Sequence, residues 1–457
     1  MSSVIASASH QSRTENTPAQ LRRLIVINWI IAAIVCAVTM ISYGEHRHAV
    51  QTVGRDAAPS VVLAHKIKNA VLNQDADIVN YLIAKPGENN ASIEDFRKRS
   101  SELAADLISA AENITYGDAE RIPIRTLELE LTNYATTIQS AIDQHDRRDA
   151  AYLVSYRKAY EILQNKLLPA ADALNQANAT VLAETYARES SRSNYTLVAV
   201  VISGLALIAW IVYTQRYLSR KFNLRLSGML LTAGVLAAGF TAWTSVAFMW
   251  ESSDLVKAKE WSYDSVVALM DARASAYDAN AAESRWLLDP TMRTQHEQMF
   301  VKRAGELVTL KANSDFASAE RQAQNKETIK AFTGSLATEL NNITFTGERE
   351  AATATLHWFG VYIAIDKQIR ALELSGHHAE AIALCIGNES GQSNWAFNNF
   401  DGALGDTLKI NQDKLDEYVA AGFADINMLW GFSLAQALLQ ALLFLLALRP
   451  RIKEYLL

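Results

Sequence analysis

The chain has 457 residues, of which 50% are hydrophobic and 20% are charged, and its formal net charge at pH 7 is −6. Its seven prolines and nineteen glycines are well below the average usage of roughly 5% and 7%, which argues against collagen-like, disordered and turn-rich β architectures. With only two cysteines, Cys36 and Cys385, it has neither a disulfide framework nor a cysteine-rich metal site. Long helices are therefore expected, and at roughly 150 residues per domain the length allows about three folding units.

Four apolar runs, 24–43, 195–213, 226–249 and 428–448, contain no Asp, Glu, Lys or Arg. Each has about 19 to 24 residues, which suffices for a helix rising about 1.5 Å per residue to cross a hydrocarbon core of about 30 Å. The sequence therefore predicts four transmembrane helices. No cleavage site of the signal-peptide type follows the first run, so we expect it to be an uncleaved anchor.

Charges beside the spans predict the orientation of the chain. The segments 1–23, 214–225 and 449–457 together carry ten basic and two acidic residues, whereas 44–194 carries 17 and 21, and 251–427 carries 16 and 26. The positive-inside rule places the three short segments, including both termini, in the cytoplasm and the two large segments in the periplasm of a bacterial inner membrane. The short segments leave no room for a kinase, cyclase or nucleic-acid-binding domain. We therefore expect no enzymatic activity and a partner that acts on the signal.

The two large segments resemble each other in sequence, as internal repeats do. The anchors are Ser60-Val61-Val62, which recurs as Ser265-Val266-Val267, and Phe96-x-Lys98-Arg99-x-x-Glu102-Leu103, which recurs as Phe300-x-Lys302-Arg303-x-x-Glu306-Leu307. Further along, Asn113-x-x-Tyr116 matches Asn313-x-x-Phe316 at an offset of 200, and Asn178 matches Asn411 at an offset of 233. This rise in the offset predicts an insertion in the second copy, between 321 and 411. Asn342-Ile343-Thr344-Phe345 also matches Asn113-Ile114-Thr115-Tyr116, and we assign it to the insertion.

Each copy is predicted to contain four helices. In the first copy, helix one is expected to end near Ala84, and helix two to run from about Ser92 to about Glu112. Helix three has Pro123 in its first turn, and helix four returns from about Asp149. Kinks are expected at Pro59 and Pro169. The expected fold is an all-α membrane protein with four transmembrane helices and two tandem extracytoplasmic four-helix bundles, at 44–194 and at 250–427 with the insertion.

Two pairs of charged residues are candidate ligand-binding groups. Asp75 and Asp278 fall in mostly apolar stretches of helix one in the two copies, where a buried polar group needs a partner. They could bind a ligand amine or make structural hydrogen bonds. Arg121 and Arg321 each follow a glutamate, and a guanidinium can grip a carboxylate through two hydrogen bonds. Pairing with that glutamate at a helix start is the alternative.

Histidines suggest a metal site only weakly. His46 and His48 are two residues apart and His377 and His378 are adjacent, so neither pair shares a helix face. A tetrahedral zinc site also needs further ligands, and the sequence offers no evident third one. We expect no metal and no other cofactor.

Tryptophan is distributed unevenly between the copies. The second contains Trp261, Trp286, Trp358 and Trp395, with Trp250 at its base, whereas 44–194 has none. Because tryptophan is enriched at binding hot spots, we expect any ligand or partner to bind the second copy, with Trp286 as a candidate contact. A larger core built by the insertion explains the same asymmetry.

Small residues recur every four positions in the third span, at Gly234, Ala238 and Ala242. Such a stripe allows close helix contact in a membrane. The contact is either with another span of the same chain or with a second copy in a homodimer.

Family resemblance adds to these inferences. The layout of each half resembles the four-helix-bundle sensor domains of bacterial chemoreceptors and histidine kinases. The two membrane-flanked repeats, the stretch Leu167-Leu168-Pro169-Ala170-Ala171 and the tail Leu448-Arg449-Pro450-Arg451-Ile452-Lys453-Glu454-Tyr455 resemble the actinobacterial GlnX-type membrane proteins. That resemblance implies a place between a periplasmic amino-acid-binding lipoprotein and a cytoplasmic Ser/Thr kinase.

The sequence therefore predicts a sensor or signal-relay protein of the inner membrane. A ligand or ligand-loaded binding protein would shift helix four against helix one, and continuous helices would carry the shift to the cytoplasm. A non-catalytic scaffold or assembly component is the alternative. A transporter ranks third, because the four spans contain no charged residue of the kind that marks an ion or substrate pathway.

Overall fold

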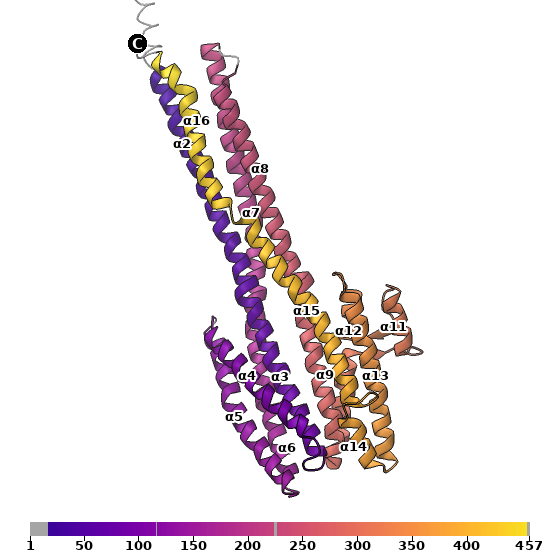
Figure 1. Ribbon diagram of the computed structural model, residues 1–457. Helices are drawn as coiled ribbons and strands as arrows, with labels where there is room; N and C mark the ends of the chain where they lie inside the picture. Colours follow the sequence, from indigo (N-terminus) through magenta and orange to yellow (C-terminus); the bar gives the residue numbers. More distant parts are fainter. Residues whose placement is uncertain (1–16, 116, 224–225, 455–457) are drawn as a thin grey trace, which may run out of the picture. The chain divides into compact units, whose positions relative to one another are not determined.

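The computed structural model describes residues 17–115, 117–223 and 226–454 of the chain (Figure 1). Tyr116 and Tyr455 of the motifs above lie outside the described residues, as do Arg13 and Arg225, which belong to the basic residues beside the spans. The described chain is almost entirely helical and has four helical runs long and apolar enough to cross a membrane. The expected all-α membrane protein is therefore confirmed.

The first half of the chain is a succession of helices. In order they are α2 (Thr17–Gln51), the π-helical turn η1 (Thr52–Ala57), α3 (Ala58–Ile83), α4 (Asn90–Glu112), α5 (Asp118–Asp146), α6 (Tyr152–Ile162), the π-helical turn η2 (Leu163–Leu167) and α7 (Leu168–Phe222). Helix α5 begins at Asp118, so Pro123 lies in its second turn rather than in its first turn as expected. The acidic side chains of Asp118 and Glu120 in its first turn favour this earlier start, because they lie at the positive end of the helix dipole.

The second half contains shorter elements as well. In order they are α8 (Gly228–Val256), the π-helical turn η3 (Lys257–Tyr263), α9 (Asp264–Leu288), the 3₁₀ turn η4 (Pro290–Met292), α10 (Arg293–Leu307), β1 (Thr309–Leu310), α11 (Phe316–Gln324), β2 (Phe332–Thr333), α12 (Ser335–Asn341), α13 (Glu348–Leu374), α14 (His378–Ile386), α15 (Ser393–Ile426) and α16 (Leu429–Lys453). The strands β1 and β2 pair antiparallel, with Thr309 opposite Thr333.

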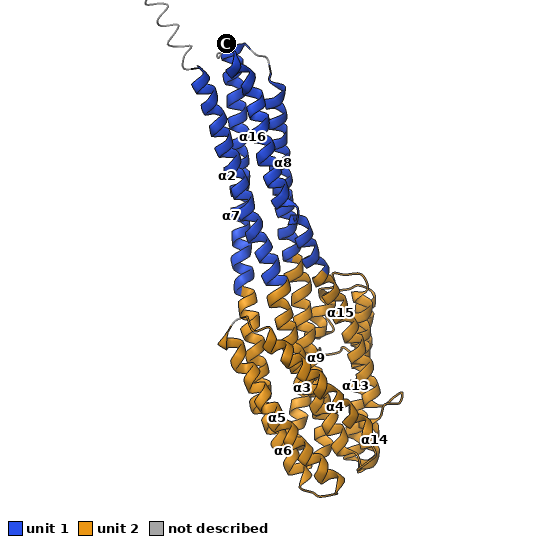
Figure 2. Cartoon of the chain, turned by 60° about the vertical axis from the view of Figure 1, so that its left-hand side comes forward, with its two compact units in different colours: residues 1–54, 184–256, 417–457 blue, residues 55–183, 257–416 orange. Residues whose placement is uncertain are grey.

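Two compact units divide the chain (Figure 2). The membrane unit comprises residues 1–54, 184–256 and 417–457, and the double-repeat unit comprises residues 55–183 and 257–416. The chain passes from one unit to the other within helical runs, such as the run Thr17–Ile83 that contains α2, η1 and α3.

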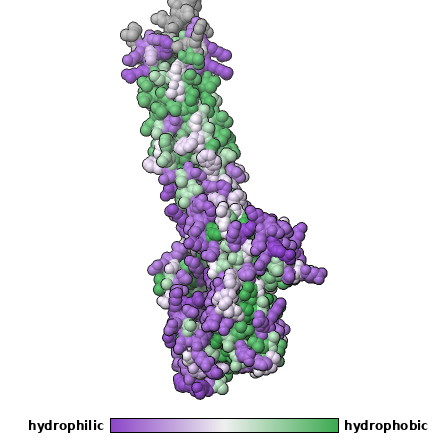
Figure 3. All heavy atoms as spheres, turned by 45° about the vertical axis from the view of Figure 1, so that its right-hand side comes forward, coloured by the Kyte–Doolittle hydropathy of each residue, from purple (hydrophilic) through white to green (hydrophobic). Residues whose placement is uncertain are grey.

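The membrane unit contains the apolar parts of α2, α7, α8 and α16. Leu24, Leu207, Leu230 and Phe444 pack in its interior, whereas outward side chains such as Ile41, which is 65% exposed, have no protein cover. On the face in Figure 3, apolar residues spread over the middle of this unit and hydrophilic residues cover most of the double-repeat unit. An apolar surface of this extent suits lipid rather than water. The chain is a multi-pass membrane protein.

A close helix contact in the membrane unit involves a glycine other than the predicted stripe. A Cβ atom on Gly204 of α7 would lie 2.3 Å from Thr241 Oγ1 of α8, so only glycine fits this approach. At Gly234, in the predicted stripe, a Cβ would meet only Ile211 Cγ2, at 3.8 Å. Of these two glycines, Gly204 makes the closer approach between α7 and α8.

The double-repeat unit has one core that both repeats share. The first repeat consists of α3, α4, α5 and the helix that α6, η2 and the start of α7 form; the second consists of α9, α10, α13 and the first part of α15, with additional short elements. The equivalent helices α3 and α9 pack against each other. Ile67 and Leu127 of the first repeat and Phe359 and Phe400 of the second belong to the same buried cluster. The two repeats therefore fold as one unit.

Wide π-helical turns precede two of the prolines. The turn η1 lies just before Pro59, and η2 lies just before Pro169. Proline lacks the N–H that would bond to the carbonyl four residues earlier, and a local change to π-helical bonding accommodates that loss. In the second repeat η3 begins at Lys257, which corresponds to Thr52 by the same offset that relates Ser60 to Ser265, but no proline follows it there.

Hydrogen bonds identify the true repeat partner of Asn113. Asn113 Nδ2 donates to Ser60 Oγ at 2.9 Å, and Asn342 Nδ2 donates to Ser265 Oγ at 3.4 Å. Ser60 and Ser265 are repeat partners, so Asn342 is the counterpart of Asn113. The prediction that matched Asn113 with Asn313 is wrong. It rested on the similar residues around the two asparagines, whereas the contact with the serine of helix one, which decides the match, is not visible in the sequence.

Buried glutamates support the corrected alignment. Glu120 accepts a hydrogen bond from the backbone N–H of Thr115, and Glu348 accepts one from that of Thr344. Both carboxylates are buried at the start of the third helix of their repeat, α5 and α13. Their offset is 228, close to the 229 that separates Asn113 from Asn342.

The insertion in the second repeat interrupts helix two. The offset is 204 at the pair Leu103 and Leu307 and has risen to 229 at the pair Asn113 and Asn342, so the insertion lies between these anchors. Helix α10 accordingly ends at Leu307, while the uninterrupted α4 continues to Glu112. The added residues form β1, α11 and β2. The predicted position of the insertion, between 321 and 411, is therefore wrong.

Candidate functional site

A buried arginine joins the two repeats at the contact between α3 and α9. Arg285, 0% exposed, donates from Nη1 to Asp75 Oδ2 of the first repeat and from Nη2 to Asp278 Oδ1 of the second, at 2.5 and 2.9 Å. Its guanidinium also lies over the ring of Tyr160, 4.5 Å from the centroid. Arg303 Nε donates to the second oxygen of Asp278 at 2.9 Å. We call Asp75, Asp278, Arg285 and Arg303 the seam network.

The seam network balances two carboxylates with two guanidinium groups. Tyr134 and Tyr156 donate their hydroxyls to Asp75 Oδ1, at 3.4 and 3.2 Å. Burial raises the pKa of Asp75, and the charge of Arg285 opposes that rise. Breaking a buried pair of this kind by removing one partner typically costs about 3–5 kcal/mol. The network therefore fixes how the repeats pack, and a ligand amine at Asp75 or Asp278 would have to displace an arginine.

A small polar cleft of about 60 Å³ lies between the same two repeats. Its lining combines carboxylates, amides and a guanidinium from both repeats, among them Asp77, Asn80, Arg99, Asn280, Asn394 and Asp401. Arg99 Nε donates to Asp77 Oδ2 at 2.8 Å, and burial raises the pKa of Asp77 to about 7 although Arg99 opposes the rise. A cleft with this lining suits a small polar solute or a few ordered waters.

Trp286 lies in the core of the second repeat. Its side chain is buried, and the guanidinium groups of Arg293 and Arg370 lie 4.7 and 4.8 Å from its ring centroid. Trp358 and Trp395 are partly buried and pack edge to face, with ring centroids 5.0 Å apart. These positions favour the core interpretation of the tryptophan asymmetry, and direct ligand contact by Trp286 stays a prediction.

Arg121 and Arg321 are both exposed, and they do not occupy equivalent places. Arg121 Nη1 donates to Asp118 Oδ1 at 2.7 Å, with 61% of its side chain exposed. Arg321, in α11 of the insertion, donates from Nε to its own helix at Ala317 O. Because Glu120 aligns with Glu348, the true counterpart of Arg121 is Arg349. The structure brings neither arginine to the seam network.

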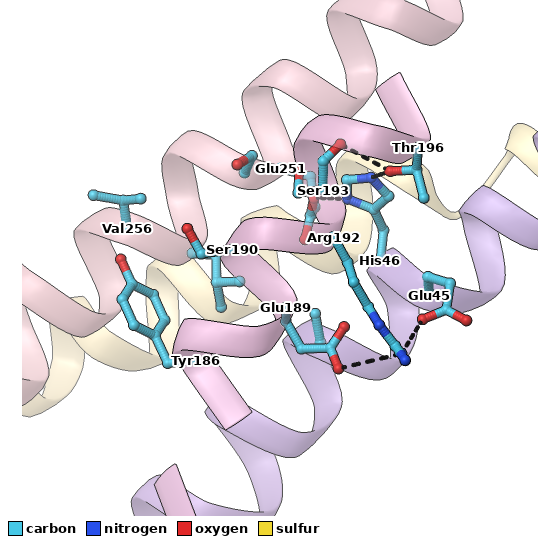
Figure 4. Close-up of a pocket in the computed structure, with 13 residues that line it drawn as sticks. Glu45, His46, Tyr186, Glu189, Ser190, Arg192, Ser193, Thr196, Glu251 and Val256 are labelled. Carbon is cyan, nitrogen blue, oxygen red and sulfur yellow. Dashed lines mark hydrogen bonds and ion pairs between the residues drawn. The ribbon is translucent and has the colours of Figure 1, made fainter. Parts of the chain in front are cut away.

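A second polar cluster lies beside the spans in the membrane unit (Figure 4). The imidazole of His46 is buried between α2, α7 and α8: Nδ1 pairs with Glu251, Nε2 lies 3.0 Å from Thr196 Oγ1, and the ring stacks on Phe248 with centroids 4.3 Å apart. Nearby, Arg192 donates to Glu45 at 2.9 Å.

The repeat alignment explains the partnership of His46 and Glu251. Their offset of 205 is that of Ser60 and Ser265, so they occupy equivalent positions on α2 and α8. This cluster ties three helices together where each leaves its apolar span. His48, expected alongside His46 in a metal hypothesis, instead has Nδ1 3.5 Å from Thr52 Oγ1.

Sequence reasoning missed Arg285. It is a single arginine in the stretch Ala281-Ala282-Glu283-Ser284-Arg285-Trp286-Leu287-Leu288, and no spacing rule distinguishes it from a surface residue. The one available signal was its repeat position: at the offsets of 205 and 204 that relate the repeats in this region, Arg285 falls opposite Asn80 or Tyr81 and has no charged counterpart.

A comparison with known families finds a match over the first repeat. Residues 49–187 match the model of the actinobacterial sensor domain. The match extends from the end of α2 into α7 and thus contains the whole first repeat of the double-repeat unit. It supports a sensor protein of actinobacterial type and a sensor or signalling role. No curated protein and no solved structure matches the chain.

Proposed function

We propose that this chain is a bacterial inner-membrane sensor that detects a periplasmic ligand or ligand-loaded binding protein and passes the signal to a cytoplasmic or membrane partner. The observation that carries the proposal is the match of residues 49–187 to a sensor domain whose first and last helices belong to runs that contain membrane spans. The excess of basic residues in the three short segments supports cytoplasmic termini and periplasmic repeats.

The polar cleft is the proposed place for a small polar solute. Because both repeats line it, a solute there would change the packing of α3 and α4 against α9 and α15. The pair of Asp77 with Arg99 is partly solvent-accessible, unlike Arg285, and can exchange partners at lower cost.

Helical continuity supports transmission by helix displacement. The runs Thr17–Ile83 and Tyr152–Phe222 each contain a span and a helix of the first repeat, so a small shift of one against the other has a direct covalent route to the membrane unit. Each run includes a π-helical turn, η1 or η2. The relay itself has no catalytic step, and partners carry out the chemistry.

The resemblance to GlnX-type proteins leads us to propose specific partners. These are a periplasmic solute-binding protein on one side and a cytoplasmic Ser/Thr kinase on the other. Neighbouring genes for both would support this arrangement.

A scaffold that braces partners in the membrane is the second candidate. The seam network favours it, because a closed and charge-balanced contact between repeats suits a rigid brace. The two candidates differ in one respect. In a relay, a change of packing in the double-repeat unit shifts the membrane helices against one another, whereas in a brace the membrane helices keep their arrangement.

Thiol cross-linking at the ends of α2 and α7 separates relay from scaffold. Tyr217 donates its hydroxyl to Gln20 Oε1 at 2.7 Å. Because two long side chains make this contact, cysteines at these positions, in a chain lacking Cys36 and Cys385, are joined by a flexible bismaleimide rather than by a direct disulfide. The relay predicts that Asp77→Asn, which removes the charge pair in the polar cleft, alters the rate of cross-linking in cells.

The matched control is Glu94→Gln, an exposed change on α4 that leaves the cleft intact. It should leave the rate at the wild-type value. Equal rates for wild type, Asp77→Asn and Glu94→Gln would contradict the relay and favour the scaffold.

A further inference from the structure

An apolar groove of about 450 Å³ runs along the first repeat between α4 and α5. Phe96, Leu103 and Leu107 line it from α4, and Ile124, Leu131 and Thr132 line it from α5. At its edge Ile108 is 60% exposed. Among the described residues, the groove is lined by α3, α4 and α5 alone.

The second repeat shows what covers the equivalent face. By the offset of 228 that aligns α5 with α13, Leu131 and Thr132 correspond to Phe359 and Gly360. Phe316 of α11 packs on this pair: its ring centroid lies 6.2 Å from that of Phe359, and a Cβ atom on Gly360 would come within 2.9 Å of its ring. The insertion therefore fills, in the second repeat, the place that is open in the first.

Helix α11 is a short amphipathic helix held by three kinds of contact. Besides Phe316, its Ala319 and Ala323 are fully buried. Its N-terminus is capped by Asp315, whose carboxylate accepts from Ser318 N at 2.8 Å. Its last turn receives a hydrogen bond from Arg349 Nη1 to Ala323 O at 3.2 Å.

The first repeat keeps the equivalent arginine, but no helix in the described part of the chain is docked beside it. Arg121 is the counterpart of Arg349 and lies at the start of α5, exposed, with its described partner Asp118 only three residues away. A guanidinium at this position can donate to the free carbonyls in the last turn of a helix lying in the groove. The groove therefore determines the shape of an occupant, and the arginine determines which end of a bound helix lies at the start of α5.

We propose that the α4–α5 groove is a docking site for a short amphipathic helix of a partner protein, which inserts an aromatic side chain between α4 and α5 and places its C-terminal carbonyls at Arg121. The occupant is thus the intermolecular counterpart of α11. This inference goes beyond the proposed function, because a helix can dock here whether the chain relays a signal or braces an assembly.

A synthetic peptide copying residues 314–326 of the chain, labelled with a fluorophore, is the probe. The fluorescence anisotropy of the peptide is measured while full-length protein in lipid nanodiscs is added in increasing concentration. The proposal predicts saturable binding that weakens at least roughly tenfold when the phenylalanine of the peptide is replaced by alanine, because that ring supplies most of the buried apolar surface.

Two variants of the protein test the groove and the arginine separately. Thr132→Trp fills the groove from an exposed position, and Asn133→Trp on the next residue, which does not line the groove, is its matched control. Arg121→Ala removes the docking cation, and Arg125→Ala removes an exposed arginine one turn further along α5. The proposal predicts lost binding with Thr132→Trp, weaker binding with Arg121→Ala, and wild-type binding with both controls. All four variants are compared by circular dichroism and thermal unfolding first.

Three results would overturn the proposal. The first is no saturable binding of the peptide, or equal binding by Thr132→Trp and Asn133→Trp. The second is saturable binding of a small apolar dye such as anilinonaphthalene sulfonate that Thr132→Trp abolishes, with no peptide binding, which would make the groove a small-molecule pocket. The third is a dimer in sedimentation velocity that Thr132→Trp dissociates, which would make a second copy the occupant.

Discussion

Replacing Arg285 by methionine tests the seam network. Methionine keeps much of the side-chain volume but leaves Asp75 with only the hydroxyls of Tyr134 and Tyr156 as described partners. Asp278 keeps its bond to Arg303. Removal of one member of a buried ion pair costs about 3–5 kcal/mol, so we expect the free energy of unfolding of the double-repeat unit to fall by about that amount.

The loss should depend on pH in a defined direction. Burial raises the pKa of Asp75, and Arg285→Met removes the positive charge that opposes this rise. A carboxyl whose pKa is higher in the folded state binds its proton more tightly there, so stability falls as pH rises from the unfolded value of about 3.9 through the folded value. The deficit of Arg285→Met is therefore smallest in acid and grows toward neutral pH.

The assay is thermal unfolding of the full chain in nanodiscs, followed by tryptophan fluorescence. At roughly 2–4 °C per kcal/mol for a large unit, the loss of about 3–5 kcal/mol should lower the midpoint by roughly 6–20 °C at pH 7. Adding Asp75→Asn should restore part of the loss, because it removes the uncompensated buried charge. The control is Arg121→Met, whose pair with Asp118 is mostly exposed and should change stability by less than about 0.5 kcal/mol. A loss no greater than that of Arg121→Met, or a loss independent of pH, would refute the reasoning.

Three further substitutions have defined expectations. Trp286→Leu should cost about 2–4 kcal/mol with little change in helical content, because it removes a buried ring that two guanidinium groups contact; thermal unfolding and circular dichroism measure both. Asp77→Asn removes a carboxyl whose pKa is raised to about 7, so the wild-type midpoint should fall relative to the variant as pH rises from about 4 to about 8. Gly204→Val should cost about 1–3 kcal/mol by clashing with Thr241, whereas Gly239→Val, at a position with nothing within 4 Å, should be nearly neutral.

The fold class was predictable because its signals are local. Uncharged runs of about 19 to 24 residues reveal membrane spans wherever they occur. The repeat anchors in helix one also aligned correctly: the offset of Ser60 and Ser265 is the one that pairs His46 with Glu251 in the structure. In both cases the residues that form the sequence pattern are also the residues that determine the structural feature.

The site was harder to predict, because its features depend on contacts between distant segments. Asp75 and Asp278 were singled out as buried acids, but their shared partner Arg285 is a lone charge without a motif. The insertion was misplaced because Asn313 lies in a sequence similar to that around Asn113, while the contact that decides the alignment joins Asn342 to Ser265. The α4–α5 groove exists because the first repeat lacks a segment that the second has, and no local pattern reports such an absence.

Thiol labelling in intact cells tests most directly the central claim that the double-repeat unit receives its signal outside the cytoplasm. Single cysteines are placed at exposed Ser101 of α4 and exposed Ala19 of α2, in a chain lacking Cys36 and Cys385, and treated with a membrane-impermeant reagent. We predict that the cysteine at 101 is labelled in intact cells and the one at 19 only after permeabilisation. Labelling at 19 but not at 101 in intact cells would contradict the claim.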